Sequence, residues 1–122
     1  MVLVIDDEAA LREVIQEILD LFGIHCLLAP NGREGLQLFV EHQATIKAVL
    51  LDMQMPIMSG SETLQELRKL SPTVQIVLMS GYPEASTMEK LRGEKHLSYL
   101  EKPFTVDKLT LKMDELLGSL RS

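Results

Sequence analysis

The sequence predicts a doubly wound α/β domain, in which helices cover both faces of an open parallel sheet. The segments between its apolar runs carry apolar residues at helical spacing, so strands and helices should alternate. Nearly continuous apolar strands are typical of a parallel sheet that is buried on both faces and joined by right-handed crossovers. An α/β barrel would need more repeats than this chain holds. The five apolar runs lie at 2–5, 24–29, 46–51, 74–79 and 97–100.

Two of the helical segments have apolar stripes that should pack on the sheet. The first stripe ends before Gly23, a residue type suited to the left-handed backbone that often closes a helix. The second ends before Pro72, which cannot continue a helix. The first stripe comprises Leu11, Val14, Ile15, Ile18 and Phe22, and the second comprises Leu64, Leu67 and Leu70.

Three helix starts are marked by polar residues. Asn31 and Glu34 have the spacing of a capping box, in which the first residue and the residue three positions later satisfy each other's backbone N–H groups. Ser59 and Glu62 have the same spacing, and Thr105 can cap the last helix. These signals place helices after the second, third and fifth strands.

The segment from Glu84 to His96 is polar and interrupted by glycine, so we expect a short or irregular fourth helix. In the final helix Leu111 lies about 160° around the axis from Leu109 and Met113, and it should therefore point toward solvent. The residues expected to face the sheet are Val106, Leu109, Met113, Leu116, Leu117 and Leu120.

Composition limits the class of protein. The 122 residues, 46% of them hydrophobic, are expected to form one domain, 1–122, either a stand-alone protein or part of a longer chain. The net charge of −6 and the absence of a basic run argue against direct binding to nucleic acid or anionic membranes. Cys26 is the single cysteine and no apolar run reaches the roughly 20 residues that span a bilayer, so we expect a cytoplasmic domain.

Polar residues follow four of the five expected strands. Because the carboxyl ends of parallel strands share one edge of the sheet, where ligands bind in such folds, these residues should converge there. They are Asp6, Asp7 and Glu8 after the first strand, Asp52 after the third, Ser80 and Gly81 after the fourth, and Glu101, Lys102 and Pro103 after the fifth.

The three aspartates among these residues carry charges that should repel one another. If Asp6, Asp7 and Asp52 lie within a few ångströms, each ionised pair repels by about 4 kcal/mol at an effective dielectric constant near 20. Such a cluster calls for a cation, and its oxygen ligands suit Mg²⁺, which binds few protein groups and retains several waters. Lys102 and Ser80 could complete the coordination of phosphate oxygens.

Four motifs carry a resemblance to a known family. "VLVIDDE", "LLDMQMPIMSG", "LMSGY" and "YLEKPF", in this order and spacing, resemble the receiver domain of two-component response regulators across the whole chain. The resemblance implies a flavodoxin-like fold with five parallel strands in the order 2-1-3-4-5. The segments "SGY" and "SYLEKPFT" also resemble receivers attached to hybrid sensor histidine kinases.

The resemblance implies a role for each site residue. Asp52 would accept a phosphoryl group from a phosphohistidine of a histidine kinase or a histidine phosphotransfer domain. Asp7 would bind Mg²⁺ directly and Asp6 through water, while Asp52 would add an oxygen and Gln54 its backbone carbonyl. Lys102 would pair with the phosphoryl oxygens.

The resemblance also implies a conformational output. Ser80 and Tyr99 match the family's switch pair, and Gln54 and Tyr82 occupy positions that tune hydrolysis of the acyl phosphate. Phosphorylation would favour a homodimer or an effector complex through the surface of helix 4, strand 5 and helix 5, where Leu111 lies. As an isolated domain, the chain would not be an enzyme, although it would assist its own phosphorylation and dephosphorylation.

Three other functions can be weighed against the receiver. A phosphatase of the haloacid dehalogenase type also forms an aspartyl phosphate, but enzymes of that type have a second Asp two residues after the first, where this chain has Gln54. A flavodoxin-like FMN carrier is disfavoured because the loop "DDEAA" would repel the flavin phosphate. A receiver acting only through contacts is disfavoured because all of the expected site residues are present.

Overall fold

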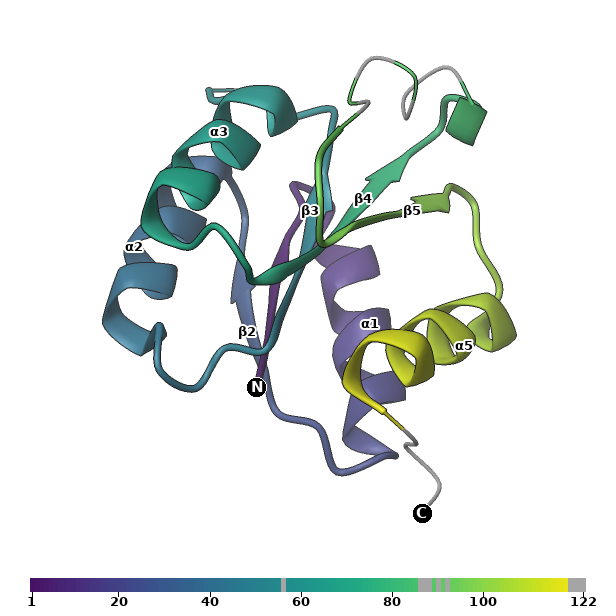
Figure 1. Ribbon diagram of the computed structural model, residues 1–122. Coiled ribbons are helices and arrows are strands. Elements are labelled where there is room, and N and C mark those ends of the chain that lie inside the picture. The colour runs from purple at the N-terminus through teal and green to yellow at the C-terminus, as the bar shows by residue number, and fades with distance from the viewer. Residues whose placement is uncertain (56, 86–88, 90, 92, 119–122) are drawn as a thin grey trace.

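The computed structural model describes residues 1–55, 57–85, 89, 91 and 93–118. Within this part of the chain, five parallel strands form one sheet in the order β2-β1-β3-β4-β5, which confirms the predicted topology. Helices α1 and α5 lie on one face of the sheet, and α2 and α3 lie on the other (Figure 1). The strands are β1 (Val2–Ile5), β2 (Cys26–Ala29), β3 (Ala48–Asp52), β4 (Gln75–Ser80) and β5 (Leu97–Glu101).

The helices begin where the sequence predicts. Ser59 and Glu62 form a complete capping box, and the Thr105 side chain accepts a hydrogen bond from the Lys108 N–H at 3.1 Å. The Asn31 side chain accepts a hydrogen bond from the Glu34 N–H at 2.9 Å. The Glu34 carboxylate accepts in turn from the Asn31 side-chain amide at 3.0 Å, and not from the backbone N–H as in a capping box. The helices are α1 (Ala9–Asp20), α2 (Gly32–His42), α3 (Gly60–Leu70) and α5 (Val106–Leu117).

The prediction of a short or irregular fourth helix concerns a segment that is only partly described. Glu84 and Ala85 begin a helical turn after β4, and Glu89 is also helical. Residues 86–88, 90 and 92 lie outside the described residues. The prediction that Leu120 faces the sheet likewise falls outside them, because residues 119–122 are not described.

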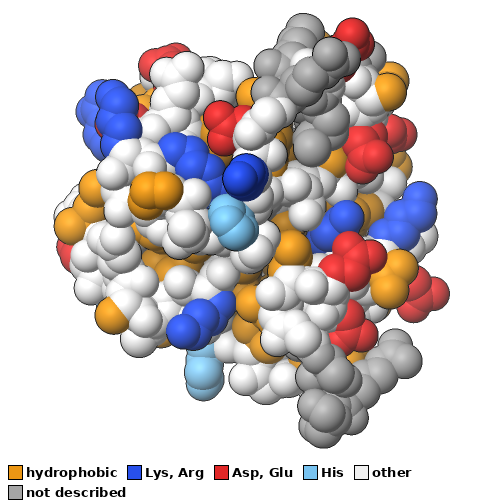
Figure 2. Space-filling model, viewed as in Figure 1, with side chains coloured by type: hydrophobic (Ala, Val, Ile, Leu, Met, Phe, Trp, Pro, Cys, Tyr) orange, Lys and Arg blue, Asp and Glu red, His pale blue; other side chains and the backbone are white. Residues whose placement is uncertain are grey.

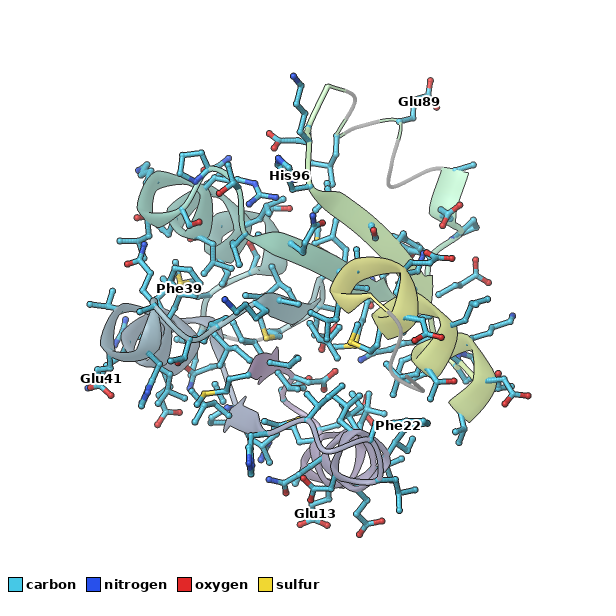
Figure 3. The ribbon with its side chains drawn as sticks, turned by 60° about the horizontal axis from the view of Figure 1, so that its bottom comes forward. Glu13, Phe22, Phe39, Glu41, Glu89 and His96 are labelled. Atoms are coloured by element: carbon cyan, nitrogen blue, oxygen red, sulfur yellow. The ribbon has the colours of Figure 1, made fainter. Side chains whose placement is uncertain are left out.

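The core is divided by the sheet into two layers. One layer lies under α2 and α3 and includes Phe39 and Leu67, and the other lies under α1 and α5 and includes Ile15 and Met113. Figure 3 shows Phe39 turned from α2 toward the sheet, while the labelled acids Glu13 and Glu41 point outward from α1 and α2. Cys26 packs against the second layer as a free, half-buried thiol, and burial raises its pKa to about 11.

Three residues of the predicted stripes are not in the core, and one of them is Leu70, which is 38% exposed. Val14 is 47% exposed and Val106 is 54% exposed, whereas Leu19, which the sequence pattern did not single out, is fully buried. Val14 precedes the buried Ile15, and successive residues are 100° apart around a helix. The Val14 side chain therefore reaches the boundary with solvent. Leu111 is 61% exposed, as predicted.

A close approach at Gly60 fixes the start of α3 against the end of β3. A Cβ atom at this position would lie 2.4 Å from the Met53 Cα and 2.7 Å from the Asp52 carbonyl oxygen, and both of these are backbone atoms. Only glycine permits this contact without moving the backbone. The geometry of the loop after Asp52 therefore depends on a residue without a side chain.

Arg68 ties α3 to the turn that precedes β5. Its guanidinium donates to the carbonyls of Ser71, Val74, Lys95 and His96 at 3.3, 2.8, 3.0 and 2.9 Å. Burial lowers the pKa of Arg68, and Glu94, whose carboxylate lies 3.8 Å from the Arg68 Nε, opposes this shift. This contact holds together the amino ends of β4 and β5, at the edge of the sheet opposite the acids.

Candidate functional site

Three carboxylates converge at the carboxyl edge of the sheet. Asp52 ends β3, and Asp6 and Asp7 directly follow β1, which is paired with β3 in register. Oxygen atoms of Asp6, Asp7 and Asp52 all lie within 4.8 Å of one another. Asp6 is fully buried and Asp52 is 2% exposed, whereas Asp7 is open to solvent. The predicted convergence of these acids is therefore present.

Lys102 supplies the positive charge inside this cluster. It follows β5, and its Nζ atom donates to the Asp6 Oδ2 atom at 2.8 Å and lies 3.5 Å from the Asp52 Oδ1 atom and 3.8 Å from the Glu8 Oε1 atom. Burial alone would lower the Lys102 pKa, but the pairing with Asp6 and the attraction of the other two acids raise it. Lys102 is therefore a fixed ammonium group at neutral pH.

The pKa of the Asp52 carboxyl lies well above its ordinary value. Burial raises its pKa to about 6, and the charge of Asp6 and a side-chain contact with Asp7 add to the shift. The Gln54 backbone N–H, which donates to the Asp52 Oδ1 atom at 3.1 Å, and the charge of Lys102 act in the opposite direction. One lysine therefore does not fully offset the burial and repulsion at this position.

Local backbone bonds hold the acids in place. The Glu8 N–H donates to the Asp6 Oδ1 atom at 2.9 Å, and the Gln54 N–H makes the equivalent bond to Asp52, two residues after the acid in both cases. The Arg12 side chain donates to the Asp6 backbone carbonyl at 2.7 Å. The sequence did not single out Arg12, whose spacing of six residues from Asp6 matches no local motif.

The predicted switch residues meet beside the acids. The buried Ser80 hydroxyl accepts from the Tyr82 N–H at 3.1 Å and from the Gln54 Nε2 atom at 3.2 Å. Tyr99 is 4% exposed, and its hydroxyl donates to the Tyr82 carbonyl and lies 3.5 Å from the Ser80 carbonyl. Tyr82 itself is 63% exposed. The structure thus places Gln54, Ser80, Tyr82 and Tyr99 in one connected group.

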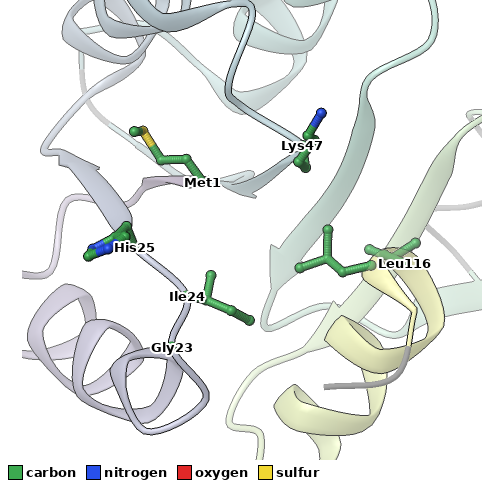
Figure 4. A pocket seen from close by; sticks show the side chains of 7 residues that line it. Met1, Gly23, Ile24, His25, Lys47 and Leu116 are labelled. Carbon is green, nitrogen blue, oxygen red and sulfur yellow. The ribbon is translucent and has the colours of Figure 1, made fainter. Parts of the chain in front are cut away.

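A pocket at the opposite edge of the sheet has different chemistry. Figure 4 shows this cavity of about 540 Å³, lined by residues that precede β1, β2 and β3 and by the end of α5. His25 and Lys47 are its titratable side chains, and both are exposed. Among the described residues, no carboxylate lines it, and none of the three clustered acids is part of it. In the part of the chain that the structure describes, every helix is too short or too polar to traverse a bilayer.

Comparison with known proteins identifies the family. Residues 2–114 match the model of the response regulator receiver domain. The chain therefore belongs to this family, whose members accept phosphoryl groups in two-component signalling. The haloacid dehalogenase alternative finds no support in these matches.

The relatives include both regulators and sensor kinases. The chain is 32% identical over 120 residues to the transcriptional regulatory protein ZraR of Klebsiella oxytoca, covering 98% of this chain and 27% of that protein. It is 33% identical over 111 residues to the autoinducer 1 sensor kinase/phosphatase LuxN of Vibrio campbellii, covering 88% of this chain and 12% of that protein. The chain thus spans about a quarter or less of these relatives.

A solved structure supports the same conclusion at the level of the fold. The response regulator receiver domain protein from Clostridium thermocellum superposes with a TM-score of 0.85 and 30% identity, over 95% of this chain and 92% of that one.

The raised pKa of Asp52 predicts that the free energy of unfolding of the metal-free protein falls as pH rises. Its pKa is about 6 when folded and near 3.8 when unfolded, so the stability that it contributes is present below pH 4 and lost as pH rises through 6. Asp52→Asn removes this loss. In urea unfolding with a chelator, the gain in unfolding free energy from Asp52→Asn should be about 1 kcal/mol larger at pH 7.5 than at pH 5. Asp20→Asn, at an exposed carboxylate, is the matched control, and equal gains at both pH values would contradict the raised pKa.

Proposed function

We propose that Asp52 is the phosphoacceptor of this receiver domain and that it takes a phosphoryl group from a phosphohistidine of a histidine kinase or a histidine phosphotransfer domain. The observation that carries the proposal is the burial of Asp52 at 2% exposure between two further acids and Lys102. A carboxylate in such a place is costly unless it reacts or binds, because its charge is desolvated and repelled.

The proposed reaction is a direct transfer between donor and acceptor. An Asp52 carboxylate oxygen bonds to phosphorus as the phosphorus–nitrogen bond to the donor histidine breaks, and the imidazole nitrogen keeps the electron pair of that bond. The product is an acyl phosphate. Such transfers depend on in-line positioning and on neutralising the phosphoryl oxygens more than on a general base. Lys102, whose Nζ atom lies 3.5 Å from the Asp52 Oδ1 atom, would contact those oxygens.

The donor set of the acid cluster fits Mg²⁺. We propose that Asp6, Asp7, Asp52 and the Gln54 backbone carbonyl hold this ion, because they offer hard oxygen ligands and Asp7 faces solvent, where coordinated water can remain. A bound Mg²⁺ would neutralise negative charge on the phosphoryl group. It would also relieve the repulsion that Lys102 offsets only in part.

We further propose that Ser80 and Tyr99 act as the switch pair and that Gln54 and Tyr82 set the lifetime of the acyl phosphate. The hydrogen bonds that join these four residues support the proposal. The isolated domain would catalyse only its own phosphorylation and dephosphorylation. A cytoplasmic location, where phosphohistidine donors of this kind act, and the extent of the domain as 1–122 remain predictions.

Phosphorylation can be tested with a small phosphodonor. Incubation with Mg²⁺ and acetyl phosphate should add a single phosphoryl group, detected by intact mass, and Asp52→Asn should abolish the addition because the accepting oxygen is lost. Asp107→Asn, at an exposed carboxylate in the first turn of α5, is the control and should be labelled normally. Undiminished labelling of Asp52→Asn would refute the assignment, and sustained release of phosphate over many turnovers would favour a phosphatase.

The output surface is proposed to include β5 and α5. A groove of about 370 Å³ there is lined by carboxylates and lysines around the exposed Leu111. Figure 2 shows acidic and basic side chains interspersed over α5 on this side of the molecule. Mixed charges around an apolar residue fit a protein partner, either a second copy or an effector domain. The charged residues of the groove are Glu84, Glu101, Lys108, Lys112 and Glu115.

If the partner is a second copy of the domain, the non-covalent phosphoryl mimic BeF₃⁻ should raise the mass measured by sedimentation. Leu111→Glu should weaken this self-association by about tenfold or more, because it buries a charge at the contact. Leu21→Glu introduces the same change at the leucine that directly follows α1, which is 84% exposed, and it should leave the association unchanged. Equal association of the native protein and Leu111→Glu would exclude Leu111 from the contact, and no association in either would favour an effector domain.

A further inference from the structure

Gln54 connects the phosphoacceptor to the switch serine through two different groups. Its backbone N–H donates to the Asp52 Oδ1 atom at 3.1 Å, and its side-chain Nε2 donates to the Ser80 hydroxyl at 3.2 Å. The first contact is local and follows from the turn after β3. The second joins residues 26 positions apart, at the ends of neighbouring strands. The side chain therefore bridges the acceptor loop and the end of β4.

The Ser80 hydroxyl has a limited number of hydrogen-bonding positions. A serine hydroxyl can accept through two lone pairs and donate one hydrogen. The Tyr82 N–H and the Gln54 amide occupy both accepting positions. Among the described residues, no acceptor is seen for the Ser80 hydrogen. Because Ser80 is 1% exposed, bulk water does not freely take that place.

We infer that Gln54 is a positioning residue for phosphoryl binding, and that it acts by orienting the Ser80 hydroxyl as a hydrogen-bond donor toward a phosphoryl oxygen at Asp52. With both lone pairs engaged, the hydroxyl keeps only its hydrogen for a new partner. An anionic oxygen at Asp52 is such a partner, and a donor fixed before it arrives loses less entropy on binding. The inference rests on the proposed function and assigns Gln54 a role separate from any control of water access.

The same bond reaches the aromatic member of the switch pair. Tyr82 donates its N–H to the Ser80 hydroxyl and accepts the Tyr99 hydroxyl at its carbonyl. A shift of Ser80 toward a phosphoryl group would therefore pull on the backbone unit that holds Tyr99. Gln54 lies at the other end of this chain of hydrogen bonds and is exposed, so its replacement should not disturb the core.

The test measures BeF₃⁻ binding in the presence of Mg²⁺ by ¹⁹F NMR. Gln54→Met keeps the length of the side chain but cannot donate a hydrogen bond, and it should weaken BeF₃⁻ affinity by about threefold to tenfold, less than direct loss of an oxyanion donor. Gln54→Asn keeps the amide but is one methylene shorter, and it should behave like Gln54→Met. The unfolding midpoint should not change, because the Gln54 side chain is exposed.

A double-mutant cycle with Ser80→Ala decides whether Gln54 acts through Ser80. In the Ser80→Ala background, Gln54→Met should have no further effect on BeF₃⁻ affinity, because the group that it orients is absent. The inference would be overturned if Gln54→Met weakened BeF₃⁻ affinity equally in both backgrounds. It would also be overturned if either Gln54→Met or Gln54→Asn bound BeF₃⁻ with native affinity. Absence of BeF₃⁻ binding by the native protein would instead remove the proposed function, and the inference with it.

Discussion

The mutual repulsion of three carboxylates at one edge of the sheet is the constraint on which the rest of the site depends. Asp6 and Asp52 are buried, and their oxygens lie with those of Asp7 inside 4.8 Å. Lys102 contacts two of these acids, yet the Asp52 pKa is still raised to about 6. The folded protein therefore holds an excess of negative charge that a bound cation can neutralise.

The pairing of the strands and one close backbone contact hold these acids in position. The pairing of β1 with β3 brings Asp6 and Asp52 to the same level, and the close contact at Gly60 fixes the loop that follows Asp52. The Lys102 N–H donates to the Ser80 carbonyl at 2.7 Å, so Lys102 and Ser80 are held by one backbone bond. The acids, Lys102 and Ser80 thus depend on the same register of parallel strands.

Much of this architecture could be predicted from the sequence because it follows from topology. Parallel strands place their carboxyl ends on one edge, so the residues after the strands identify the site without any distance being known. The caps at Ser59 and Thr105 were predictable because they are local. Apolar patterns were less informative at strand starts, since β2 begins at Cys26 although the apolar run begins at Ile24. Apolar residues before a strand can pack on the core without joining the sheet.

Contacts between distant side chains could not be predicted. Arg68 binds carbonyls up to 28 positions away, and nothing in its helical surroundings distinguishes it from a solvated arginine. The bond from Gln54 to Ser80 depends on the side-chain rotamer and on the width of the gap between two loops. Val14, Leu70 and Val106 failed as core predictions because a helix at the surface exposes the flanks of its apolar stripe.

The most direct test of the central claim is a calorimetric titration with Mg²⁺ at pH 7.5. If the cluster is a cation site created by the three acids, the native domain should bind one Mg²⁺, and Asp7→Asn and Asp52→Asn should each weaken that binding by about tenfold or more, because each removes a charged oxygen ligand. Native affinity for Mg²⁺ in both variants would contradict the account, since the acids would then be held together for a purpose other than binding the ion.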